Sequence, residues 1–376
     1  MQSSASCLSS APRDTSAARA SARPFTWSAW LIALALGSAC SLGACGTDDS
    51  DESAQGGESA QGGAGGGAQT HGFDPADLPP ITFGAYHSYA ETAAYLADVA
   101  EVAQGITSYA VLGQSVDGRD IPYLVINATA QDSPAAVFLN GAHHGDEHPS
   151  SEALLGFVDH VLRHLDDSVV LDGLGHYAVY VLPIVNPDGF EAETRDNAHG
   201  VDLNRDYAGP TIAEAAAFSQ VETQAMKQLI DQSHFVAAAA FHSSPTAEEV
   251  LWPWGYSAEP TADAAELAAI GESTALAMGL DRYLQSYADY PTSGEFLDYA
   301  YFKTHTLAFT LEVSVPKKPS ASALPGIVEA AVAGTLAMLQ ELHATEAGSV
   351  QARVIAAPSF GLGHVAALDP SGGKLE

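Results

Sequence analysis

A histidine and a glutamate stand three residues apart in a polar segment that follows an apolar run. His144 and Glu147 lie within residues 141–148, and an imidazole and a carboxylate on one short turn are ligands that suit Zn²⁺. A third ligand is expected from His242, which directly follows the apolar run 235–241. Two histidines and one glutamate leave a fourth zinc position open, as in catalytic sites. These residues therefore predict a site for one zinc ion.

Two arginines follow a second polar motif. Arg195 and Arg205 come after the Asn-Pro-Asp-Gly-Phe segment at 186–190, and Asp202 and Asn204 stand between them. The planar guanidinium can hold a carboxylate through two hydrogen bonds, and it can also stabilise a developing oxyanion. The alternative is that both arginines form ordinary surface ion pairs with neighbouring acidic side chains.

A glutamate interrupts an apolar stretch late in the chain. Glu312 lies within the run 307–313, where a buried carboxylate is costly unless it is paired or functional. Beside a metal site, such a glutamate is a natural general base. A Tyr-Pro-Thr-Ser-Gly segment that begins at Tyr290 also lies late in the chain, and its tyrosine is a further candidate.

Charge and cysteine content exclude several classes of protein. The chain has 376 residues, with 14 Lys plus Arg against 46 Asp plus Glu and a formal net charge of −32. Such a balance leaves no surplus of cations to neutralise phosphates, which argues against a nucleic-acid partner. All three cysteines lie within residues 1–45, so the body of the chain has no disulfide framework and no cysteine nucleophile.

The first 45 residues are typical of an export signal. Three arginines precede the apolar stretch 27–44, which closes on Leu-Gly-Ala-Cys and resembles a bacterial lipobox. In such signals the cysteine, here Cys45, carries the lipid. We therefore expect an outer-membrane or cell-surface lipoprotein that contacts the membrane only through this anchor. The alternatives are an ordinary cleaved signal with secretion, or an uncleaved anchor.

Residues 46–75 form an acidic tether rich in Gly, Ser and Ala, which cannot bury apolar area and is expected to be disordered. Once residues 1–45 are removed, 11 basic and 45 acidic residues remain, a net charge of −34. Only six arginines are left, so each arginine within a motif carries more information than usual.

From residue 83 to 345 the apolar pattern switches between short runs and helical periodicity. Runs such as 236–240 lack alternation, which indicates strands buried on both faces. The pattern predicts one globular α/β domain over 76–345, with a mixed, mostly parallel central sheet flanked by helices, and a tail of unknown role at 346–376. The polar motifs follow strand ends, where open α/β sheets place their sites. Expected strands are 109–112, 121–126, 135–139, 177–185, 235–241 and 307–313, and expected helices are 92–103, 150–165, 212–229, 262–277, 294–303 and 326–343.

These motifs stand in the order found in zinc metallocarboxypeptidases. The chain resembles the carboxypeptidase A and carboxypeptidase T branch of that family over residues 83–345. Segments 113–119 (Gly-Gln-Ser-Val-Asp-Gly-Arg) and 252–256 (Trp-Pro-Trp-Gly-Tyr) match the same family. Each motif alone is weak, whereas their ordered conjunction is specific. The resemblance implies that family's fold, zinc cofactor and exopeptidase activity on the C-termini of peptides or proteins.

The resemblance also implies the roles of the residues around the metal. His144, Glu147 and His242 would bind one Zn²⁺, and Asp202 would orient the ring of His144. His143 offers a competing register, with Glu147 four positions on. His144 is preferred because the family motif is His-x-x-Glu.

The remaining roles implied by the resemblance concern the substrate. Asn204 and Arg205 would grip its terminal carboxylate, and Tyr290 would close over it. Glu312 would take a proton from the attacking water and later deliver it to the leaving amine. Arg195 would stabilise the oxyanion together with the metal.

Three positions depart from the family pattern or refine it. Asp146 stands where carboxypeptidase A-like enzymes have an arginine, and Ser244 where an aromatic residue usually follows the His-Ser pair. Both changes place contacts to an extended substrate in question. By ungapped spacing from Tyr290, Leu297 falls at the base of the specificity pocket, which favours apolar or aromatic terminal residues.

We therefore expect a monomeric, zinc-dependent carboxypeptidase on peptide or protein C-termini. A second hydrolytic alternative is a carboxypeptidase or amidase of murein peptides in the cell envelope, which Asp146 and the export signal favour. An alternative from another class is an inactive zinc domain that binds peptides. The intact Glu312 and Arg195 argue against it.

Overall fold

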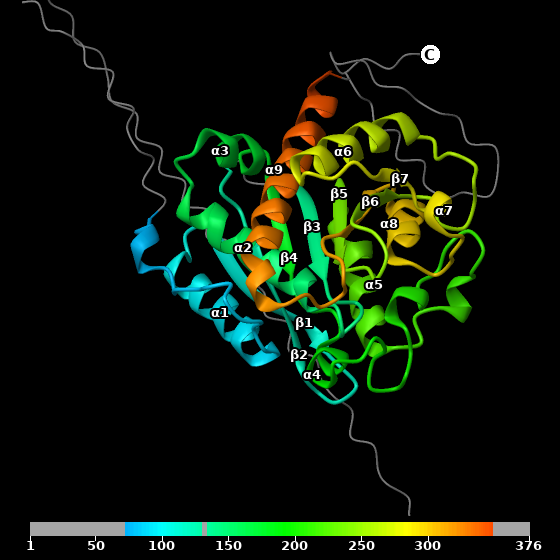
Figure 1. Ribbon diagram of the computed structural model, residues 1–376, viewed down its shortest axis with the longest axis horizontal. Coiled ribbons are helices and arrows are strands. Elements are labelled where there is room, and N and C mark those ends of the chain that lie inside the picture. The colour runs from blue at the N-terminus through cyan, green and yellow to red at the C-terminus, as the bar shows by residue number, and fades with distance from the viewer. Residues whose placement is uncertain (1–71, 130–133, 349–376) are drawn as a thin grey trace, which may run out of the picture. The chain divides into compact units, whose positions relative to one another are not determined.

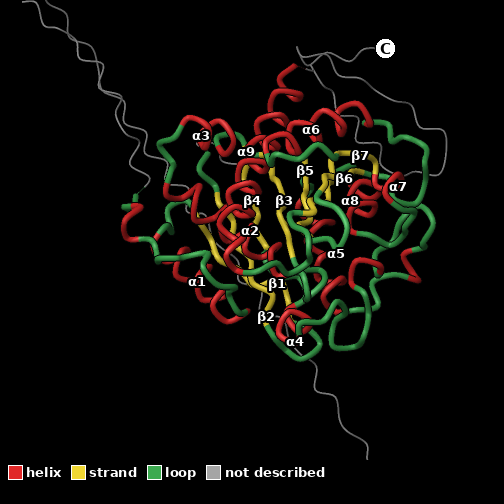
Figure 2. Tube along the Cα trace, viewed as in Figure 1, coloured by secondary structure: helices red, strands yellow, loops and turns green. Residues whose placement is uncertain are grey.

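The computed structural model describes residues 72–129 and 134–348. The export signal with Cys45, nearly all of the tether and the chain beyond 348 lie outside these ranges. The described residues form an eight-stranded sheet with helices on both faces (Figure 1), and Figure 2 shows the strands running together between the helical layers. The strand order is β1-β2-β4-β3-β5-β8-β6-β7. The strands are β1 Thr107–Gln114, β2 Asp120–Ile126, β3 Ala135–Gly141, β4 Tyr177–Leu182, β5 Ala237–His242, β6 Glu249–Trp252, β7 Tyr283–Gln285 and β8 Leu307–Glu312.

The centre of the sheet is parallel, and its edges are mixed. Strands β4, β3, β5 and β8 pair in parallel, β1 and β2 are antiparallel, and β6 joins β8 in antiparallel register. Every residue of β5 is buried, which is the reason for its unbroken alanine-rich sequence. Register places His242 opposite Glu312 at the carboxyl ends of β5 and β8. The predicted mixed, mostly parallel sheet flanked by helices is confirmed.

Helices cover the two faces of the sheet unequally. Helices α1, α2, α3, α6 and α9 contribute to one large hydrophobic cluster, and α5 and α8 pack on the opposite face (Figure 1). Helix α9 is long and apolar enough to cross a membrane by length and composition, but half of its most apolar stretch is buried and it packs against α2 and α6. It is therefore a core helix of this domain. The helices are α1 Tyr89–Val102, α2 His148–Arg163, α3 Ser168–Leu174, α4 Pro187–Ala192, α5 Val221–Ser233, α6 Ala264–Ala277, α7 Ser286–Asp289, α8 Phe296–Thr304 and α9 Leu324–Gly348.

One expected helix begins later than its sequence pattern indicates. The alanine-rich pattern predicts a helix over 212–229, whereas α5 starts only at Val221. The carboxylate of Asp206 accepts hydrogen bonds from the backbone N–H groups of Ser219 (2.9 Å) and Gln220 (3.0 Å). This acceptor, which comes from a distant loop, fixes the start of the helix and overrides local propensity.

Candidate active site

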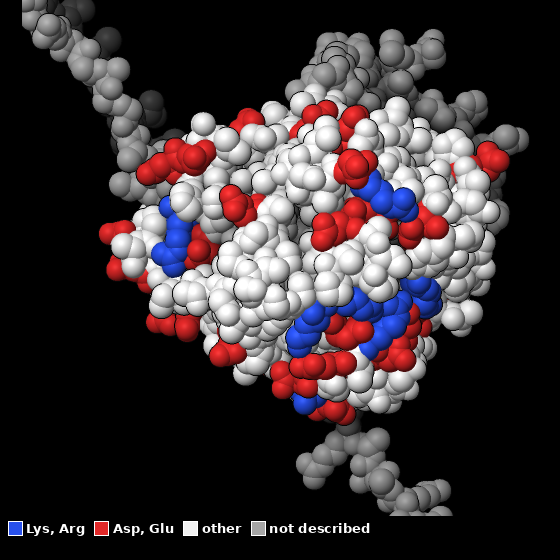
Figure 3. All heavy atoms as spheres, in the orientation of Figure 1, with Lys and Arg blue, Asp and Glu red and all other residues white. Residues whose placement is uncertain are grey.

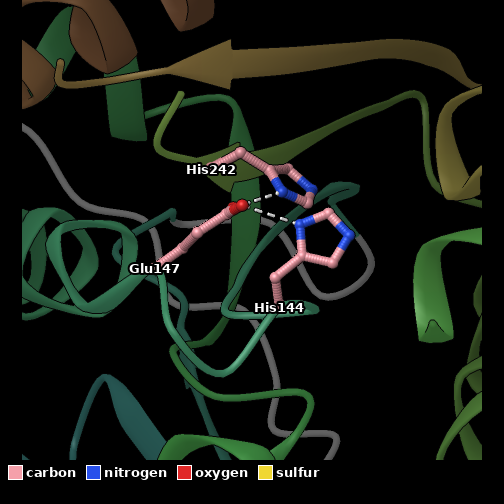
Figure 4. Close-up of side chains that lie close together, drawn as sticks. All are labelled: His144, Glu147 and His242. Carbon is pink, nitrogen blue, oxygen red and sulfur yellow. Dashed lines mark hydrogen bonds and ion pairs between the residues drawn. The ribbon is translucent and has the colours of Figure 1, made fainter. Parts of the chain in front are cut away.

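The three expected metal ligands converge in the structure. His144 and Glu147 lie on the turn between β3 and α2, and His242 is the last residue of β5. Their side chains point toward one another (Figure 4): Nδ1 of His144 is 2.8 Å from Oε1 of Glu147, and Nδ1 of His242 is 2.8 Å from Oε2. One ligand atom from each residue lies within 4.8 Å of the other two. All three side chains are buried.

This donor set fits zinc. Two imidazole nitrogens and one carboxylate oxygen form a three-ligand site of the catalytic type, with a fourth position free for water or substrate. Burial lowers the pKa of His242, which favours the neutral imidazole that a metal requires. His143 points elsewhere: its ring is fully buried, and its Nε2 is 2.9 Å from the hydroxyl of Tyr207. The structure thus places His144, not His143, in the ligand set.

Asp202 links the metal site to an arginine. Its Oδ1 is 3.1 Å from Nε2 of His144, on the side of the ring away from Glu147. Its Oδ2 accepts hydrogen bonds from Nε (3.0 Å) and Nη2 (2.8 Å) of Arg195. The same carboxylate therefore orients the imidazole and holds the guanidinium beside the metal ligands. Nη1 of Arg195 lies 3.8 Å from Oε1 of Glu147.

A second arginine lies farther along the site. Nη2 of Arg205 donates to the hydroxyl of Tyr290 (3.0 Å), and Nη1 lies 3.3 Å from Oε1 of Glu295. Tyr290 is about half exposed. Asn204 makes different contacts. Its Oδ1 accepts a hydrogen bond from the backbone N–H of Phe296 (2.9 Å), and its Nδ2 faces His242.

The loop that carries Tyr290 is joined to the loop that carries Arg205. Gly294 has φ +82°, and a Cβ on it would lie 2.4 Å from the backbone oxygen of Arg205. The N–H of Tyr207 donates to the backbone oxygen of Gly294 at 3.0 Å. Only glycine fits this close approach with this backbone conformation.

Glu312 ends β8 beside His242 and directly opposite Glu249 of β6. Its Oε2 is buried and has no hydrogen-bond partner in the part of the chain described. Burial, together with the negative charges of Glu147 and Glu249, raises its pKa well above the ordinary value. The side chain is thus a buried carboxyl group that faces the metal ligands and is free to exchange a proton.

These residues line one cavity of about 390 Å³. The expected ligands, Glu312, both arginines, Asn204 and Tyr290 all lie on its wall. Leu297 does not: it is 1% exposed and packs in the hydrophobic cluster with Phe138 and Phe296. The expectation that Leu297 forms an apolar pocket base is therefore corrected. The residue follows the start of α8 and its side chain turns into the core rather than toward the cavity.

Four charged residues of the cavity were missed from the sequence: Lys317, Glu249, Asp289 and Glu295. Nζ of Lys317 lies 2.8 Å from Oε1 of Glu147 and 3.2 Å from Oδ2 of Asp146, so a lysine pairs with the unusual aspartate. Glu249 and Glu295 also line the cavity. Their only sequence signals are weak, because a lone acidic residue next to a motif is common. On the face shown in Figure 3, basic side chains gather in a band between α4 and α8, bordered by acidic ones.

Comparison with known proteins agrees with this geometry. Residues 92–334 match the model of the zinc carboxypeptidase family. The chain is 25% identical over 313 residues to carboxypeptidase E of Caenorhabditis elegans, covering 65% of each chain, and 24% identical over 299 residues to mouse carboxypeptidase M, covering 70% of this chain and 67% of that protein. The crystal structure of carboxypeptidase A from Helicoverpa armigera shares the fold, with a TM-score of 0.61, 23% identity and coverage of 72% of this chain and 76% of that one. The chain spans about two thirds of the length of the curated relatives. Because the family match covers well over half of the sequence, this chain belongs to the zinc carboxypeptidase family.

Proposed function

We propose that this protein is a metallocarboxypeptidase that hydrolyses the last peptide bond of peptides or proteins. The observation that carries the proposal is the content of a single cavity. Its wall holds the ligand set of His144, Glu147 and His242 together with Arg205, a partly exposed cation. A guanidinium in that position suits a substrate's free carboxylate. Because the ligand set and Arg205 line the same cavity, the arrangement favours cleavage at a chain end.

Each side chain then has a task that its contacts support. Arg205, with the Tyr290 hydroxyl beside it, binds and positions the terminal carboxylate. Arg195, fixed by Asp202, donates hydrogen bonds to the oxygen of the scissile carbonyl as charge develops there. Glu312 accepts a proton from the attacking water and returns it to the leaving amine. Zinc, when bound, polarises the carbonyl and the attacking water.

The test is direct and uses the zinc-loaded protein. Peptides with a free C-terminus should lose residues one at a time from that end, as seen by mass spectrometry, and a chelator should stop the reaction. The same peptides with an amidated C-terminus should resist cleavage, because Arg205 would have no carboxylate to bind. Glu312→Gln should lower kcat by about 10²- to 10⁴-fold while the zinc content stays at one ion per chain.

Two results would contradict this proposal. Cleavage of amidated peptides as fast as free ones would remove the role of Arg205, and full activity of Glu312→Gln would remove the general base. Murein stem peptides belong in the same panel. If they alone were cleaved, the envelope murein-peptide activity would replace the general carboxypeptidase. Binding of peptides with no cleavage at all would favour the inactive domain instead.

We also propose that the protein is exported, that a lipid on Cys45 anchors it to the outer membrane or cell surface, and that it is a monomer. The Leu-Gly-Ala-Cys motif after an apolar stretch supports the anchor. In a bacterial host, the full chain should incorporate radioactive fatty acid and fractionate with membranes, and Cys45→Ser should do neither. Light scattering of the chain from residue 71 onward should give the mass of one copy.

A further inference from the structure

Two groups of charged side chains that contact each other line the cavity. In one, Lys317 contacts the metal ligand Glu147, and in the other, Arg205 contacts Tyr290 and Glu295. If Arg205 holds the terminal carboxylate of a substrate, the side chain of that terminal residue must lie close to Arg205. The groups around Arg205 therefore decide which terminal residue fits.

Glu295 is the charged group nearest to that position. It is 7% exposed, and its Oε1 lies 3.3 Å from Nη1 of Arg205. It occupies the N-cap position of α8, yet its side chain caps no N–H group of that helix. The carboxylate instead extends to the turn at Gly255, where a Cβ would lie 2.7 Å from Oε2. It thus fills the space that any larger residue at 255 would take.

Oε2 of Glu295 is buried and has no hydrogen-bond partner among the residues described, although Thr292 lies next to it. Burial raises the pKa of Glu295 to about 7, even though Arg205 lowers it. The contact between Oε1 and Arg205 thus compensates the buried charge only in part, and a second cation would reduce the remaining cost.

Two other acidic side chains that line the cavity, Glu249 and Asp289, already share a cation. Nη2 of Arg282 lies 2.8 Å from Oδ1 of Asp289, and its Nε donates to the carboxylate of Glu249. Glu295 has only Arg205, and the substrate's carboxylate would compete for that guanidinium. A neutral terminal side chain would leave Glu295 with less compensation than before binding, whereas a cationic one would restore it.

We propose that Glu295 is a specificity-determining residue that makes this enzyme select substrates whose terminal side chain carries a positive charge, lysine or arginine. The proposal rests on the proposed function, because it requires Arg205 to hold the terminal carboxylate. It replaces the apolar preference expected from Leu297, which packs in the core. The ammonium or guanidinium of the substrate would pair with the carboxylate of Glu295, which lines the cavity.

The test compares peptides that differ only in their last residue, with the zinc-loaded enzyme. Lysine and norleucine are the central pair, because norleucine keeps the methylene chain and lacks the ammonium group. Arginine and phenylalanine extend the panel. Wild type should have a kcat/KM for lysine at least about 10-fold above that for norleucine. Glu295→Gln should lower the ratio of the lysine value to the norleucine value by about 10- to 100-fold, with Glu295→Asp in between.

Two outcomes would overturn the proposal. One is a wild-type enzyme that releases norleucine or phenylalanine faster than lysine, a result that needs no variant. The other is a Glu295→Gln protein whose ratio of lysine to norleucine equals that of wild type. Retained cleavage of the norleucine peptide shows that this variant is folded. If no peptide in the panel loses its last residue, the proposed carboxypeptidase function fails instead, so the two failures are distinguishable.

Discussion

Replacement of Glu295 by glutamine should change how the stability of the protein depends on pH. The pKa of Glu295 is raised from an ordinary value of 4.5 to about 7, chiefly by burial. In the unfolded chain the carboxyl ionises near 4.5, whereas in the folded protein it stays protonated until near 7. Its contribution to stability is therefore fully present below 4.5 and is lost as the pH rises to 7. At roughly 1.36 kcal/mol per pKa unit, the full loss is about 3 kcal/mol.

Glutamine at 295 has no charge to form, so the variant should escape this loss. Urea unfolding of wild type and Glu295→Gln between pH 5 and pH 8.5, both in saturating zinc, gives the difference in unfolding free energy. That difference should shift in favour of the variant by about 2–3 kcal/mol across the range. Glu101→Gln, at an exposed position of α1, serves as the control and should show no such trend. A pH-independent difference for Glu295→Gln would refute the burial of an uncompensated carboxylate at this position.

Other substitutions test the metal site and the joined loops. Asp202→Asn should weaken zinc binding by about 10- to 100-fold, measured by competition with a chelator, because it replaces the charged acceptor of the His144 ring by a neutral amide. His144→Ala should lose stoichiometric zinc and His143→Ala should retain it, as read by elemental analysis; the reverse result would exchange their roles. Gly294→Ala should lower the unfolding free energy by about 1–3 kcal/mol and raise KM, since its methyl group meets the backbone of Arg205. Unchanged stability and KM would show that the two loops are not in close contact.

Much of the fold follows from local patterns. The Asp-Gly turn between β1 and β2 and the unbroken apolar run of β5 are both readable in the sequence, and both elements form within a few residues of the expected ranges. The short strands β6 and β7 were not expected. Four and three residues are too few to show a period, and these strands form by tertiary pairing, β6 with the edge of β8 and β7 with β6. The start of α5 depends on Asp206, a contact that no local pattern reveals.

The residues of the candidate site likewise differ in whether the sequence alone could identify them. His144, Glu147 and His242 could be found from spacing and strand ends, since the parallel strands bring their carboxyl ends to one edge. The position of Leu297 could not, because ungapped spacing does not say which face of a helix start turns inward. Lys317 and Glu295 act through partners far away in sequence. Their contacts could be identified only from the structure, in which all charged side chains that line the cavity can be compared.

The backbone junction between Gly294 and Arg205 has a consequence for redesign of this enzyme. Arg205, the proposed anchor of the substrate carboxylate, and Glu295, the proposed specificity residue, lie on two segments whose backbones are in close contact at Gly294. Specificity is therefore easiest to alter by exchanging single side chains on the existing loop. Grafting a loop of different length over 290–295 would also displace Arg205. Such a graft would therefore change the substrate preference and lower the affinity for every substrate.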